Sequence, residues 1–143
     1  MKSKMAQLYS ICRNHGISLV YLFGSQAQAG MKILAGEEVK CDDPLADLDV
    51  GVVTENPLPQ VSKRPALYAA LYNDLQELFV PAKLDLVFLE ENNSVFQAEA
   101  LKGICVYQVS QQKRDEYEMM ILRRAADFRP FLEKYYQEVL EEV

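Results

Sequence analysis

The stretch from Ile17 to Phe23 constrains the fold more strongly than any other part of the sequence. It is a nearly unbroken run of apolar side chains that includes β-branched and aromatic residues. Such a run is typical of a strand that is covered on both sides. Gly24 and Ser25 close the run. The sequence therefore predicts a buried strand that ends at a glycine turn.

Helical and strand patterns alternate on either side of this strand. Ser25 and Gln28 form a capping box, which predicts that a helix begins at Ser25. Apolar spacing predicts further helices over residues 2–14, over residues 62–80, and through Phe96 and Leu101 up to Gly103. Additional strands are expected at residues 47–54, 84–89 and 104–107. The order α-β-α-β-α-β with a helical tail predicts an α/β (α+β) protein.

Two segments depart from this regular alternation. Residues 30–46 lose their periodicity and concentrate charge, which predicts a surface excursion. We expect residues 31–44 to be mobile. In the tail, apolar residues from Tyr117 to Val143 recur every three or four positions and form one stripe, which Pro130 is expected to kink or break. The aromatic part of this stripe beyond Pro130 either packs on the sheet or on a symmetric copy, or docks a helical partner.

Length and composition exclude several classes of protein. The chain has 143 residues, of which 50% are hydrophobic, and this suits one soluble domain with a core at residues 1–110 and a helical tail at 111–143. The net charge of −6 argues against direct nucleic-acid binding. The lack of a long apolar run argues against a membrane span and predicts a cytoplasmic protein. A homo-oligomer remains open. The three separated cysteines favour reduced thiols over a disulfide framework or a zinc site: Cys12, Cys41 and Cys105.

Three short polar motifs lie on predicted strands or at their ends. Gly24 permits a sharp turn, and the following helix start with Ser25 can cradle a phosphate, although a plain helix cap explains this pair as well. Asp47 and Asp49 lie on one side of their strand, where paired carboxylates suit Mg²⁺, unless they only begin a solvated strand. Asp85 is a lone carboxylate in an apolar strand and needs a partner, either the first two acids or a basic residue.

Taken together, these motifs resemble the nucleotidyltransferase superfamily of DNA polymerase β, and among its branches the minimal nucleotidyltransferases (MNT). The resemblance covers nearly the whole chain. Later stretches at residues 101–107 and 124–130 are similar to the MNT antitoxins that accompany HEPN toxins. The family's GSxAxxG core, its Asp-x-Asp and its third acid are present in order as Gly24, Ser25, Ala27 and Gly30, then Asp47 and Asp49, then Asp85.

The sequence also departs from the family pattern. Gln28 stands where the family often has arginine, and Ala46 stands where it often has serine before the first acid. The gap between Ser25 and Asp47 is longer than is common, so residues 31–44 resemble an insertion of open role. The three acids are intact, which favours an active enzyme.

The resemblance implies the small mixed sheet of the polymerase-β-like nucleotidyltransferase fold and a two-metal reaction. Asp47, Asp49 and Asp85 would be the catalytic metal ligands for two Mg²⁺ ions, and Gly24 and Ser25 would bind the triphosphate of ATP. The implied function is transfer of AMP to a hydroxyl, with a tyrosine of a HEPN toxin as the favoured acceptor. Two alternatives stay open at this point: an antibiotic-type enzyme with a small-molecule acceptor, and a non-catalytic antitoxin that acts by binding.

Overall fold

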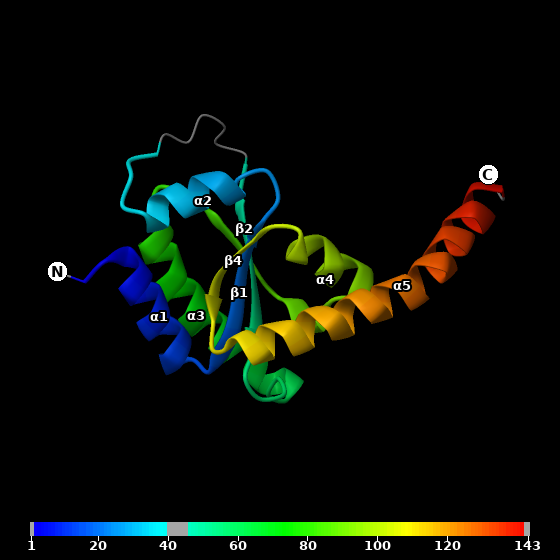
Figure 1. The fold of residues 1–143 in the computed structure, drawn as a ribbon, viewed down its shortest axis with the longest axis horizontal. Helices are drawn as coiled ribbons and strands as arrows, with labels where there is room; N and C mark the ends of the chain where they lie inside the picture. The colour runs from blue at the N-terminus through cyan, green and yellow to red at the C-terminus, as the bar shows by residue number, and fades with distance from the viewer. Residues whose placement is uncertain (1, 40–45, 142–143) are drawn as a thin grey trace.

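The fold is a single mixed sheet with helices on both of its faces (Figure 1). It is seen in a computed structural model that describes residues 2–39 and 46–141. The strands are ordered β3-β2-β1-β4, with β1 antiparallel to both of its neighbours and β2 parallel to β3. The elements, in chain order, are α1 (Lys4–Asn14), β1 (Ile17–Phe23), α2 (Ala27–Leu34), β2 (Leu48–Thr54), α3 (Arg64–Phe79), β3 (Leu84–Phe88), α4 (Ser94–Leu101), β4 (Ile104–Gln108) and α5 (Gln111–Glu141).

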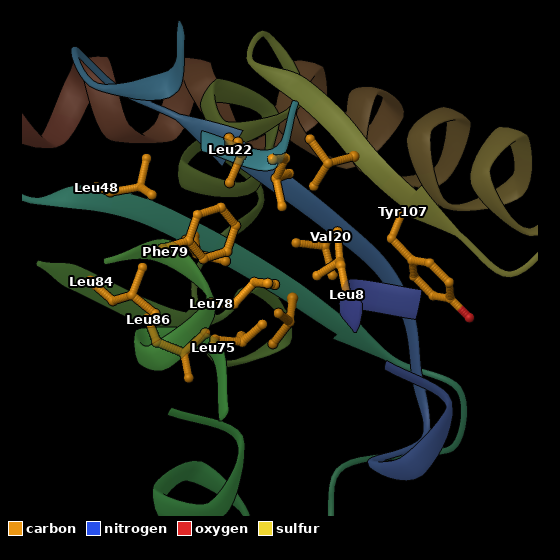
Figure 2. Close-up of a cluster of buried hydrophobic side chains, with 14 of the residues drawn as sticks. Leu8, Val20, Leu22, Leu48, Leu75, Leu78, Phe79, Leu84, Leu86 and Tyr107 are labelled. Atoms are coloured by element: carbon orange, nitrogen blue, oxygen red, sulfur yellow. The ribbon is translucent and has the colours of Figure 1, made fainter. Parts of the chain in front are cut away.

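Helices α1, α2 and α3 cover one face of the sheet and form the larger hydrophobic core (Figure 2). Val20 and Leu22 of β1 point into this core, where they meet side chains from the helices and from the neighbouring strands. Leu8 on α1 and Phe79 on α3 are fully buried there. The apolar stripes of these helices thus seal one side of the central strand.

Helix α4 and the first half of α5 cover the opposite face. Leu19 and Tyr21 alternate with Val20 and Leu22 along β1, so they point to this opposite face and pack into a second core. Helix α5 completes this core with Tyr117, Ile121 and Ala125. Because both sets of β1 side chains are buried, the prediction of a strand covered on both sides is confirmed.

The sequence predicted that Pro130 would kink or break the tail, and the break does not occur, because α5 is continuous from Gln111 to Glu141 with Pro130 inside it. The carbonyl that proline leaves without its helical donor belongs to Ala126, and this part of the helix is exposed, so water can satisfy that carbonyl. The last turns run in a different direction from the first and extend away from the body of the protein (Figure 1). In residues 2–39 and 46–141, no helix is both long and apolar enough to cross a membrane.

Two further expectations need correction. Helix α2 begins at Ala27 and not at Ser25, because the chain first makes a turn after Gly24. The excursion expected from residue 30 onward begins later, since residues up to Leu34 are helical and Ile33 is buried in the core. Residues 31–34 are thus a packed helix end, which argues against mobility there, and residues 40–44 of the segment expected to be mobile lie outside the described part of the chain.

Candidate active site

The candidate site begins at the turn where β1 ends. Gly24 has a φ of 75°, a left-handed conformation that glycine adopts far more readily than other residues. A Cβ atom added at this position would overlap the carboxylate oxygen Oδ2 of Asp49 and lie 3.3 Å from its Cγ. Glycine is therefore required here both for the backbone conformation and for the close approach of Asp49.

The first turn of α2 lies next to Gly24, and no side chain caps it. The residue that caps the helix, Gln26, makes no hydrogen bond from its side chain to the helix backbone, and Ser25 is exposed. Helix N-termini with free N–H groups attract phosphate. Gly30 holds the helix against β1 and β2, since an added Cβ would come within 2.9 Å of Leu22 and Leu48.

Two of the predicted acids lie side by side on neighbouring strands. Asp49 of β2 pairs in parallel register with Asp85 of β3, so both carboxylates project from the same face of the sheet. The register begins at a hydrogen bond of 2.8 Å from the Leu48 amide to the Lys83 carbonyl. β2 and β3 are therefore neighbours, which is the condition under which the sequence allowed Asp85 to join the other acids. β2 begins at Leu48, so Asp47 lies just before the strand and not within it as expected.

Asp49 is influenced electrostatically by the other two acids. The pKa of Asp49 is raised, first by partial burial, then by the negative charge of Asp85 and a hydrogen bond with it, and then by the charge of Asp47. Closely spaced carboxylates with this mutual repulsion are stabilised by a cation, and their oxygen atoms are the ligands that Mg²⁺ prefers. The donor set therefore fits a divalent metal ion. Within the described residues, however, no three acidic, histidine or cysteine side chains converge as a preformed metal site.

Two aromatic residues near the acids were not singled out from the sequence. Phe96 of α4 contacts Phe23, with ring centroids 5.9 Å apart, and Phe23 pairs in register with Asp49. Tyr68 of α3 has a raised pKa, caused first by burial and then by the charge of Asp85. No local sequence signal separates such residues from ordinary core aromatics, because their position follows from tertiary packing.

A pocket of about 550 Å³ lies elsewhere, between α4 and α5. It is lined by residues that include Asn93, Arg124 and Phe128, and none of the three acids belongs to it. Glu90 lines it as well and accepts hydrogen bonds from the amide and the hydroxyl of Thr54, at the end of β2 that is remote from Asp49. The acidic cluster and this pocket are therefore separate features.

Solved structures with a similar fold include several toxin–antitoxin complexes. One is a mutant of the toxin–antitoxin MntA-HpeT, with a TM-score of 0.61, 16% identity and coverage of 96% of each chain. A toxin–antitoxin structure with AMP-PNP gives the same values. A third is the tri-AMPylated Shewanella oneidensis HEPN toxin in complex with an MNT antitoxin, with a TM-score of 0.56, 17% identity and coverage of 97% of this chain and 94% of the other.

The sequence matches one protein family, although no individual curated protein matches the chain. The family described as Polymerase beta, Nucleotidyltransferase matches residues 6–112, a range that includes the Gly24 turn and all three acids. The matched range also spans all four strands of the mixed sheet. The chain therefore belongs to the polymerase beta nucleotidyltransferase family.

Proposed function

We propose that this protein is a Mg²⁺-dependent nucleotidyltransferase that moves AMP from ATP to a tyrosine hydroxyl of a HEPN-type toxin, and so acts as an antitoxin. The observation that carries the chemical part is the juxtaposition of Asp49 and Asp85 in register, with Gly24 directly against the Asp49 carboxylate. A phosphate-binding turn and a cluster of metal-binding acids are the two parts that nucleotidyl transfer requires.

In this proposal the residues have distinct roles. Asp47, Asp49 and Asp85 hold the metal, and the Gly24 backbone and the Ser25 hydroxyl bind the β- or γ-phosphate. Two Mg²⁺ ions, when bound, neutralise the triphosphate and lower the pKa of the acceptor hydroxyl. Asp85 accepts the proton of that hydroxyl. The acceptor oxygen forms a bond to the α-phosphorus as the bond to the departing pyrophosphate breaks.

The proposed acceptor comes from the fold comparisons. One similar structure contains a tri-AMPylated HEPN toxin with its MNT antitoxin, and another contains AMP-PNP. The similarity extends over 96–97% of this chain, so it includes most of α5 as well as the catalytic core. We propose that residues 1–110 carry the chemistry and that residues 111–143 add a docking helix to the same domain.

The exposed end of α5 supports this docking role. The last side chain of the helix that is buried against the body is Ala125. Beyond it, large apolar side chains are exposed along the helix, and aromatic residues of this kind are favoured anchors at protein interfaces. The exposed set is Phe128, Phe131, Tyr135, Tyr136, Val139 and Leu140.

The test is to incubate the protein with ATP, Mg²⁺ and the HEPN-type protein, and to measure the intact mass of both chains. The expected result is a gain of one or more AMP units on the HEPN-type protein, which is lost when Asp49→Asn replaces the wild type. Inhibition of the toxin without any gain in mass would support the non-catalytic antitoxin instead. Binding of Mg²⁺ and ATP without any effect on the HEPN-type protein would refute the proposed acceptor, and the proposal of nucleotidyl transfer to a different acceptor would stand.

A further inference from the structure

An aromatic side chain is exposed beside the candidate site and has no role in the proposal so far. Phe96 of α4 is 36% exposed. Its ring meets the ring of Phe23 at an angle of 89°, so the two rings form an edge-to-face pair. Phe23 directly precedes Gly24 and pairs with Asp49 across the strands. The aromatic pair therefore lies at the same end of β1 as the acidic cluster.

Phe96 is held in place by its own helix. The side chain of Asn93 caps α4 and accepts a hydrogen bond of 2.8 Å from the Phe96 backbone amide. At the other end of the helix, an added Cβ at Gly103 would overlap the carbonyl of Leu22, which shows how closely the chain after α4 approaches β1. The cap orders the first turn of α4, where Phe96 lies, and the close approach at Gly103 holds the end of the helix against β1, so Phe96 is a positioned side chain.

The anchoring of α4 does not depend on the exposed part of this ring. Gln97, Ala98 and Ala100 are the buried residues of the helix. Gln97 also accepts a hydrogen bond of 2.6 Å from the hydroxyl of Tyr117 on α5 and donates one to the Asn92 carbonyl. Packing of α4 is thus accounted for by other side chains.

A flat apolar ring beside a phosphate-binding turn has one chemical use that stands out. Nucleobases stack on exposed aromatic rings, and this contact is tolerant of the base because every base presents a π face. We propose that Phe96, supported by Phe23, stacks on the base of the bound nucleoside triphosphate. The inference rests on the proposed function and adds a residue that recognises the nucleoside, where the acids and Gly24 recognise only the triphosphate and its metal.

The proposal separates binding of the base from binding of the phosphates. Titration calorimetry with Mg²⁺ present compares two ligands, ATP and inorganic tripolyphosphate, on the wild-type protein and on Phe96→Ala. Loss of the stacking contact is expected to weaken ATP binding about tenfold, while tripolyphosphate binding stays within about twofold. Tyr9→Ala removes a ring that is 41% exposed on α1 and that also forms an edge-to-face pair, with Tyr107, so it serves as the matched control, with neither affinity changed.

A second variant distinguishes stacking from a merely structural role. Phe96→Tyr keeps the aromatic face, so it is expected to retain wild-type affinity for ATP. If Phe96→Ala weakens both ligands equally, or if it leaves ATP binding unchanged, the stacking role is overturned although the proposed function survives. If the wild-type protein binds neither ligand in the presence of Mg²⁺, the proposed function fails and the inference fails with it.

Discussion

Replacing Gly24 by alanine tests the close approach between the turn and Asp49. The chain offers a matched control, because Gly16 also has a left-handed backbone, with a φ of 65°, and an added Cβ there would meet nothing within 4 Å. An alanine at either position takes on the same kind of backbone strain. Only at Gly24 does the new methyl group overlap the Asp49 carboxylate. The difference between the two variants therefore isolates the contact with Asp49.

The expected magnitudes follow from these geometries. A residue other than glycine in the left-handed region costs roughly 1–2 kcal/mol, so Gly16→Ala should lower the free energy of unfolding by about that amount. The new methyl group meets the end of the Asp49 side chain, which can rotate away, so Gly24→Ala should be more destabilising than Gly16→Ala by at most about 1 kcal/mol, the lower end of the usual cost of overpacking. The Asp49 carboxylate must also move, and we expect the affinity for Mg²⁺ and ATP to fall at least about tenfold, or roughly 1.4 kcal/mol.

Two measurements check this prediction. Urea unfolding gives the stability of the two variants, and titration calorimetry gives their affinity for ATP with Mg²⁺ present. We expect Gly16→Ala to bind ATP as the wild type does. The reasoning is refuted if Gly24→Ala loses no more stability than Gly16→Ala and keeps its affinity, because the turn and the carboxylate would then be independent.

Three further predictions address other parts of the chain. Asp49→Asn should lower metal-dependent ATP affinity at least about tenfold in calorimetry, whereas Asp115→Asn, an exposed change on α5, should not; equal ATP binding with and without Mg²⁺ would contradict the metal role. A chain that ends at Arg129 should keep its circular dichroism spectrum and its ATP affinity, but the intact mass of the partner should no longer increase. Collapse of the fold would show instead that the tail belongs to the core. Burial raises the pKa of Glu90 above its ordinary value of 4.5, so the folded state binds a proton at Glu90 more tightly than the unfolded state does. In urea unfolding, the wild type should therefore lose stability relative to Glu90→Gln as the pH rises through and above 4.5. A stability difference between the two proteins that does not change with pH would exclude this cause.

The sequence was sufficient where one local pattern decides the structure. The apolar run of β1 predicted its bounds and its burial on both faces, and these are confirmed at Ile17–Phe23. The pairing of the acids was predictable only conditionally, since a strand pattern shows which face Asp85 takes but not which strand lies next to it. The parallel pairing of β2 with β3 supplies that missing fact.

The errors arose where tertiary contacts outweigh a local signal. Ser25 has the spacing of a helix cap, yet the left-handed turn at Gly24 delays the helix until Ala27. Glycines near residue 30 suggested an irregular segment, but Gly30 is what allows α2 to pack closely on Leu22 and Leu48. Such contacts join residues that are distant in the chain, and periodicity within a short window does not report them.

The parallel register of β2 and β3 also determines which changes in chain length the protein can tolerate. Because side chains alternate between the two faces of a strand, adding one residue between α3 and β3 and shifting the register would turn Asp85 toward the core and an apolar neighbour toward the solvent. Adding two residues would restore the face. Substitutions in residues 80–83 are thus a milder change than the insertion of a single residue there. Related chains should therefore differ in the amino acids of this connection more often than they differ in its length by one or three residues.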